Sequence, residues 1–216
     1  MILRNLKNRI YTSFLLLILV ILIFNYNLIL ISSLIILGVI SVIEFFNIAN
    51  KIYKNNFYLF ISNIFFIIFV SSYCFMFFFF SNFIQLKIIL YCLLLSCAAS
   101  DIGGFVVGSF FKGPKITKIS PNKTISGIIG SLIFTILTFS GLIFYFTTNV
   151  SYNIILVGFI TSLTCQLGDL FFSFLKRKAK IKDTGNILPG HGGILDRLDG
   201  IFIGIPIGFI ALISLY

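Results

Sequence analysis

The sequence predicts an all-α, polytopic transmembrane helix bundle of about seven spans, with its N-terminus in the cytoplasm. Three observations support this prediction. Of the 216 residues, 59% are hydrophobic and only 10% are charged, whereas a soluble domain carries about a quarter charged residues. The apolar residues form runs close to the roughly 20 residues that a helix needs to cross a bilayer. The basic residues lie almost entirely before the first run or in alternate loops.

The spans are expected in order along the whole chain. The first run lacks a small-residue cleavage site and more spans follow it, so it is expected to be a retained span rather than a signal peptide. It is short and has to borrow flanking residues, whereas the third is long enough to tilt. The predicted spans are 11–25, 28–46, 57–80, 87–111, 125–148, 152–175 and 198–215.

The basic residues predict the orientation. All of the 16 Lys and Arg residues except Lys87 lie before the first span or in the loops after the second, fourth and sixth spans. The positive-inside rule places these segments in the cytoplasm. The net charge of +10 would raise the question of nucleic acid in a soluble protein. Here the loop positions favour orientation and contact with anionic lipid or phosphate, so no nucleic-acid partner is expected.

Two of the six acidic residues lie inside apolar runs. Asp101 falls within the fourth run and Asp169 late in the sixth. A carboxylate at the centre of a bilayer costs about 2.5–3.5 kcal/mol on insertion scales, so each needs a partner, a metal ion or water. The alternative is a polar pair that only holds the bundle together. Glu44 lies near the end of a span, where a functional role and a solvated interfacial carboxylate are both open.

Acids and bases interleave between the sixth and seventh spans. Asp169, Ser173 and Lys176 share one helix face through their i, i+4 and i+7 spacing. Asp196 and Asp199 share a face at the start of the last span, a position that also favours carboxylates on structural grounds. Mg²⁺ prefers a few carboxylates together with substrate phosphates. The pattern therefore indicates a nucleoside triphosphate bound through metal ions.

Glycines on two spans predict close helix packing. Gly200, Gly204 and Gly208 follow one another at every fourth residue of the last span, and Gly104 and Gly108 do so on the fourth. Small residues at this spacing let helix backbones approach closely. Such packing could serve a homodimer or the bundle of one chain.

The loop before the last span leaves two interpretations open. Its glycines, from 185 to 193, could expose backbone N–H groups to phosphate oxygens or only form a tight turn. The basic run 176–182 alone is more typical of an orientation signal, and its setting between acidic residues is what favours a site. His191 is the only histidine, and substrate contact and a purely structural turn are both open for it.

At these residues the chain resembles the CDP-diacylglycerol synthases, also called phosphatidate cytidylyltransferases. The family's signature is matched at each fixed position, and Gly168 with Asp169 resembles the G-D pair that precedes it. A looser resemblance upstream covers Asp101 and the segment 120–124, after which Ser126 stands in place of the family's usual Glu. The matched signature positions are Ser173, Lys176, Arg177, Lys182, Asp183, Gly185, Pro189, His191, Gly192, Gly193, Asp196, Arg197 and Asp199.

The resemblance implies that CTP and phosphatidate react to give CDP-diacylglycerol and pyrophosphate. It implies Mg²⁺ as cofactor, with room for a second metal ion, and an active site on the cytoplasmic face of a bacterial inner membrane. The implied metal ligands are Asp101, Asp169, Asp196 and Asp199. The implied phosphate contacts are Ser120, Lys123, Ser173, Lys176, Arg177 and Arg197. The implied catalytic residues are Lys176, Arg177, Lys182, Asp183, His191 and Arg197.

Two other functions are compatible with intramembrane carboxylates. A CTP-dependent transferase for another membrane lipid would share this chemistry. A transporter using Asp101 and Asp169 as an ion relay would favour charges near mid-membrane and repeated halves, neither of which the sequence shows.

Residues 1–97 are expected to form scaffold helices. Residues 98–216 are expected to form the catalytic transmembrane region, with cytoplasmic loops at 112–124 and 176–197.

Overall fold

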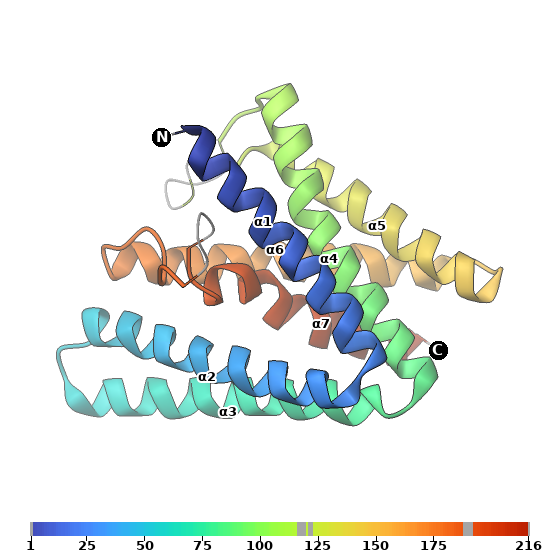
Figure 1. Cartoon of the computed structure of the whole chain (residues 1–216). Coiled ribbons are helices and arrows are strands. Elements are labelled where there is room, and N and C mark those ends of the chain that lie inside the picture. Colours follow the sequence, from blue (N-terminus) through green and yellow to red (C-terminus); the bar gives the residue numbers. More distant parts are fainter. Residues whose placement is uncertain (1, 116–119, 121–122, 188–191, 216) are drawn as a thin grey trace. The chain divides into compact units, whose positions relative to one another are not determined.

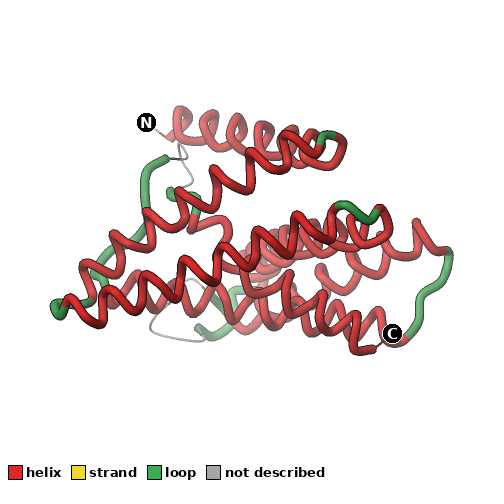
Figure 2. The backbone as a smooth tube through the Cα atoms, turned by 90° about the horizontal axis from the view of Figure 1, so that it is seen from below, coloured by secondary structure: helices red, strands yellow, loops and turns green. Residues whose placement is uncertain are grey.

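The computed structural model describes residues 2–115, 120, 123–187 and 192–215, without the side chains of residues 2–11 and 13. Within these residues the regular elements are helices, and no strand is formed (Figure 2). Each predicted span corresponds to one helix, which confirms the all-α fold. The helices are α1 (Ile2–Asn25), α2 (Asn27–Ile52), α3 (Asn56–Ser81), α4 (Ile84–Phe111), α5 (Ile125–Thr147), α6 (Tyr152–Lys178) and α7 (Leu195–Leu215) (Figure 1).

Six of these helices, α2 to α7, are long and apolar enough to cross a membrane. The apolar part of α1 is shorter, at Phe14–Asn25, as the short first run leads one to expect. Large apolar side chains also stand on the outer faces of the helices, among them Phe65, Phe105 and Phe110, which are 72%, 77% and 81% exposed. Such faces are stable in lipid rather than in water, so the chain is an integral membrane protein.

The chain divides into two compact units. The first comprises Met1–Phe79 and Leu175–Leu198. Within it α2 and α3 run side by side (Figure 1), and the rings of Phe45 and Phe66 stack with centroids 3.9 Å apart. Gly38 brings the helices together, because a Cβ there would lie 3.3 Å from the sulfur of Cys74.

The second unit comprises Phe80–Phe174 and Asp199–Tyr216, and glycines set its helix contacts. On α7, Gly204 faces Cys97 of α4 and Cys165 of α6, and Gly208 faces Thr161 of α6. On α4, Gly104 faces Ser131 of α5. The predicted close packing at these glycines is therefore confirmed, and it occurs between helices of one chain.

The loop between α4 and α5 is closed by polar contacts around the start of α5. The Thr124 side chain caps α5 by accepting a hydrogen bond from the Gly127 N–H at 3.2 Å. Ser126 Oγ accepts from the Gly113 N–H at 3.3 Å and lies 3.0 Å from Thr124 Oγ1. Ser126, at the position where the resemblance implies Glu, thus links Gly113 after α4 to Thr124 before α5.

Candidate functional site

A largely buried ion pair joins the end of α6 to the start of α7 within the first unit. Lys176 Nζ lies 2.7 Å from Asp196 Oδ1, and the two side chains are only 12% and 6% exposed. Each charge also suits its place in its helix, since Lys176 lies in the last turn of α6 and Asp196 in the first turn of α7. The sequence placed both residues in the site without predicting that they pair.

The second oxygen of Asp196 holds the loop that precedes α7. Asp196 Oδ2 accepts hydrogen bonds from the backbone N–H of Thr184 at 2.8 Å and of Gly193 at 3.0 Å, and lies 3.1 Å from Thr184 Oγ1. Gly192 adopts φ +85°, and a Cβ there would lie 2.8 Å from the same oxygen. A glycine at this position therefore serves both the left-handed backbone and the approach of the carboxylate.

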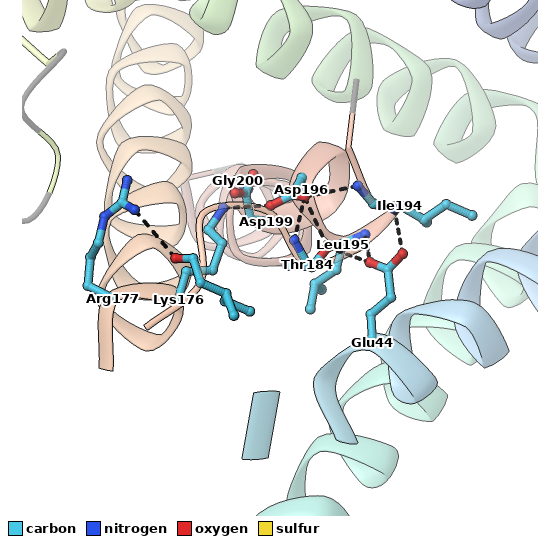
Figure 3. A network of polar contacts seen from close by, with 11 residues as sticks. Glu44, Lys176, Arg177, Thr184, Ile194, Leu195, Asp196, Asp199 and Gly200 are labelled. Carbon is cyan, nitrogen blue, oxygen red and sulfur yellow. Dashed lines mark hydrogen bonds and ion pairs between the residues drawn. The ribbon is translucent and has the colours of Figure 1, made fainter. Parts of the chain in front are cut away.

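Glu44 of α2 reaches the same loop (Figure 3). Its Oε1 accepts from the Ile194 N–H at 3.0 Å, and its Oε2 accepts from the Leu195 N–H at 2.9 Å and from Thr184 Oγ1 at 2.6 Å. Glu44 is 3% exposed, so the interpretation as a solvated interfacial carboxylate is wrong. Sequence reasoning left its role open because nothing local links it to residues about 150 positions away.

In the second unit, Asp169 and Asp199 border the same glycine. Asp199 Oδ1 accepts from the Gly200 N–H at 3.0 Å. A Cβ added at Gly200 would lie 2.8 Å from Asp169 Oδ1. Gly168 makes this approach possible from α6, since a Cβ there would lie 2.6 Å from the carbonyl oxygen of Asp199. The glycines thus bring two of the predicted metal ligands to one crossing of α6 and α7.

One of the other predicted charged residues pairs with Asp169. Lys123 Nζ lies 3.1 Å from Asp169 Oδ2, with side-chain exposures of 29% and 20%. Asp101 is exposed on α4, and its role as a metal ligand stays a prediction. Cys165 faces Gly200, whose added Cβ would lie 2.7 Å from its sulfur.

The remaining predicted residues are exposed, half-buried or outside the described part of the chain. Arg177 donates to the carbonyl oxygen of Ile181 at 3.4 Å. Four are exposed: Arg177, Lys182, Asp183 and Arg197. Ser120 and Ser173 are half-buried. His191 lies outside the described residues, as does Pro189 of the signature, so the role predicted for His191 stays a prediction.

The fit to a metal ion can be judged from the donors at hand. Among residues 2–115, 120, 123–187 and 192–215, no three or more His, Cys, Asp or Glu side chains are grouped as a ready-made metal site. Two carboxylates at one glycine nevertheless suit Mg²⁺, which takes one or two protein carboxylates and completes its shell with phosphates and water. One oxygen of Asp169 accepts from Lys123 and one of Asp199 from the Gly200 N–H, so the role of these two carboxylates in holding the ion stays a prediction. Both oxygens of Asp196 already accept from other groups, and its role as a metal ligand stays a prediction.

The fold defines an integral membrane protein, and its described residues include two lysine–carboxylate ion pairs, Lys176 with Asp196 and Lys123 with Asp169. The chain belongs to the cytidylyltransferase family, whose sequence profile matches residues 3–215.

Relatives with a named activity match about half to two thirds of the chain. It is 45% identical over 116 residues to a phosphatidate cytidylyltransferase of Mycobacterium leprae, covering 51% of this chain and 36% of that protein. It is 42% identical over 118 residues to one of Rickettsia bellii, covering 50% and 51%. It is 40% identical over 143 residues to one of Staphylococcus haemolyticus, covering 65% and 55%. The chain thus spans between about a third and just over half of these relatives.

Proposed function

We propose that this chain is a membrane nucleotidyltransferase that converts CTP and phosphatidate to CDP-diacylglycerol and pyrophosphate. The observation that carries the proposal is that Lys176 pairs with Asp196 and Lys123 with Asp169. When a metal-bound triphosphate binds, a lysine can exchange its carboxylate for a phosphate, and the carboxylate can exchange the lysine for the metal ion. Neither charge is then left without a partner. The activity named for the relatives supports the same conclusion.

The chemistry needs charge neutralisation more than a strong base. A phosphate monoester loses its second proton near pH 6, so phosphatidate arrives largely ionised. One of its phosphate oxygens attacks the α-phosphorus of CTP, a new P–O bond forms, and the bond to the β-phosphate breaks to release pyrophosphate. Lys176 would bind the triphosphate as a point charge. Lys123 would meet the lipid phosphate from its place just before the start of α5.

Mg²⁺ would be held by Asp169 and Asp199, with Asp101 and Asp196 as further predicted ligands. When bound, the ion neutralises charge on the phosphates and aligns them for in-line displacement. Arg177 and Arg197 are exposed, and as planar guanidinium groups they would grip phosphate oxygens through two parallel hydrogen bonds. A second metal ion and a homodimer remain part of the proposal.

The proposed setting is the bacterial inner membrane, with the active site facing the cytoplasm. The positive-inside rule supports this orientation, because the basic residues gather in alternate loops. CTP is a cytoplasmic solute, whereas phosphatidate lies in the membrane, so a site at the ends of spans serves both. The lipid tails would enter sideways between helices.

A lipid panel tests the function. The chain, purified into nanodiscs, is incubated with CTP, Mg²⁺ and one lipid at a time: phosphatidate, an ether-linked phosphatidate or a polyprenyl phosphate. Pyrophosphate release is measured together with the mass of the lipid product. We expect a product heavier by one cytidylyl group with phosphatidate. Transfer of the cytidylyl group to only one of the other lipids would replace phosphatidate as the proposed acceptor. If pyrophosphate release depends on none of the lipids, the proposal is overturned.

A further inference from the structure

Glu44 brings a negative charge from the N-terminal helices to the loop that carries the signature. It lies inside the candidate span α2, is 3% exposed and accepts three hydrogen bonds. A buried carboxylate is tolerated only when such donors replace water. Ionisable groups within spans are functional by default, yet Glu44 is outside the signature and none of the roles assigned above uses it.

Two of the three donors belong to the start of α7. The first N–H groups of a helix have no partner within the helix, and the positive end of the helix dipole attracts an anion there. Glu44 satisfies the N–H groups of Ile194 and Leu195, one with each oxygen. The first turn of α7, which contains Asp196, is therefore fixed by a side chain from α2.

The third donor links Glu44 to the ion pair. Thr184 Oγ1 lies 2.6 Å from Glu44 Oε2 and 3.1 Å from Asp196 Oδ2. One hydroxyl proton serves two carboxylates, and the shorter contact is to Glu44. Asp196 in turn holds Lys176 at 2.7 Å. Figure 3 shows this series of contacts from Glu44 through Thr184 and Asp196 to Lys176.

Two signature glycines make room for Glu44. A Cβ added at Gly185 would lie 2.7 Å from Glu44 Oε1. A Cβ added at Gly193 would overlap both the Glu44 carboxylate and the hydroxyl of Thr184. Gly193 and Gly185 have ordinary backbone conformations, unlike Gly192, which alone of the described glycines has a positive φ. Their lack of a side chain is therefore explained by the approach of this carboxylate.

We propose that Glu44 is a positioning residue for CTP binding: through Thr184 and the first turn of α7 it sets where Asp196 and Lys176 stand. This inference rests on the proposed function. It makes an N-terminal helix part of the site, where the sequence predicted only scaffold for residues 1–97. Glu44 does not touch substrate, and its effect passes through the contacts of the loop.

The first test separates positioning from a general loss of folded protein. Glu44→Gln keeps the size of the side chain but turns one acceptor into a donor that faces N–H groups. We expect KM for CTP to rise about tenfold, as for a buried donor left unsatisfied, with KM for phosphatidate within about twofold of wild type. If Glu44 only stabilised the fold, the variant would contain a smaller fraction of active protein, which lowers the apparent kcat and leaves KM unchanged. An unchanged KM for CTP would overturn the inference.

Ser41→Ala is the matched control. Ser41 is buried on the same helix, one turn before Glu44, and its hydroxyl donates to the Leu37 carbonyl of its own helix at 2.7 Å. We expect KM for CTP in this variant to stay within about twofold of wild type, because no loop contact is lost. A rise equal to that of Glu44→Gln would mean that any change in α2 has this effect, which also overturns the inference.

A double-mutant cycle decides the matter if Glu44→Gln does not fold. Gly185→Ala pushes a methyl group against Glu44, whereas Glu44→Asp withdraws the carboxylate by one methylene. Residues in contact give non-additive effects. Gly185→Ala is expected to raise KM for CTP by some factor in wild type. We therefore expect that factor to be smaller by at least about threefold in the Glu44→Asp background. Effects that simply multiply would contradict the contact and the inference.

Equilibrium binding of CTP keeps this inference distinct from the proposed function. If wild type binds CTP but forms no lipid product, the proposed function fails, and the ratio of CTP dissociation constants between Glu44→Gln and wild type still decides the role of Glu44. We expect that ratio to be about ten. A ratio near one would overturn the inference whatever the activity of wild type.

Discussion

Lys176 Nζ lies 2.7 Å from Asp196 Oδ1, and both side chains are largely buried. The pair joins the last turn of α6 to the first turn of α7, and so links the two ends of the connection between these helices. In the proposed function the lysine faces phosphate once the triphosphate enters. Before the triphosphate binds, the contact with Asp196 would hold the Lys176 ammonium group in position.

Removing the lysine should cost both stability and activity. Lys176→Met leaves a buried carboxylate without its cation, a change that typically destabilises by about 3–5 kcal/mol; the other donors to Asp196 favour the lower end. We expect kcat/KM for CTP to fall at least about a hundredfold, or roughly 3 kcal/mol. Thermal unfolding in detergent and steady-state kinetics measure the two effects.

Lys178→Ala is the control on the same basic run. Lys178 is exposed and its Nζ stands 5.8 Å from the centroid of the Tyr53 ring. An exposed cation–π contact is worth about 0.5–1 kcal/mol, so we expect activity within about twofold of wild type. A loss as large as that of Lys176→Met would mean that the whole run, rather than its buried member, carries the function.

The proposed metal ligands can be tested apart from turnover. We expect Asp169→Asn and Asp199→Asn each to lower turnover by about a thousandfold, equivalent to roughly 4 kcal/mol, while the proteins stay folded and inserted. Electron paramagnetic resonance of Mn²⁺ in the presence of CTP should show weakened binding in both. Asp196→Asn should abolish turnover as well. Near-normal activity in any of the three would remove that residue from the predicted ligand set.

Lys123→Ala should separate function from stability. The Lys123–Asp169 pair is partly exposed, and such pairs contribute about 0–1 kcal/mol, so the melting temperature should hardly change. If Lys123 serves the lipid phosphate, KM for phosphatidate should rise while KM for CTP stays near that of wild type. Unchanged lipid kinetics would assign Lys123 to its ion pair with Asp169 alone.

The crossing of α6 and α7 should not tolerate a methyl group. In Gly200→Ala the added Cβ would lie 2.8 Å from Asp169 Oδ1 and 2.7 Å from Cys165 Sγ, and overpacking typically destabilises by about 1–3 kcal/mol. Gly141→Ala is the control, because nothing lies within 4 Å of a Cβ at that position. It should leave stability unchanged or raise it by up to about 1 kcal/mol. Equal melting temperatures for the two variants would contradict the predicted crowding.

The sequence predicts the helices well because hydrophobic length is a local property. The predicted span 57–80 is one residue shorter than α3 (Asn56–Ser81) at each end, and the predicted span 125–148 is one residue longer than α5 (Ile125–Thr147) at its C-terminal end. The larger errors lie where polar residues continue a helix. The second predicted span ends at 46, whereas α2 continues to Ile52, because backbone hydrogen bonding does not stop where hydrophobicity does.

The site is predictable in composition but not in its contacts. Motif and spacing identified Lys176 and Asp196, yet they did not show that the two pair. Glu44 could not be assigned, since its donors are Thr184 and the first turn of α7, and no periodicity links residues so far apart. The glycine spacing on α7 did predict close packing, because small residues at every fourth position act through backbone approach alone.

The decisive measurement for the proposed function is the formation of CDP-diacylglycerol from CTP and phosphatidate by the purified chain in nanodiscs, with and without Mg²⁺. We expect equal amounts of pyrophosphate and CDP-diacylglycerol, both dependent on phosphatidate and on the ion, and both lost in Asp199→Asn. Pyrophosphate release that needs neither the lipid nor Asp199, or no release at all from folded wild type, would contradict the proposed function.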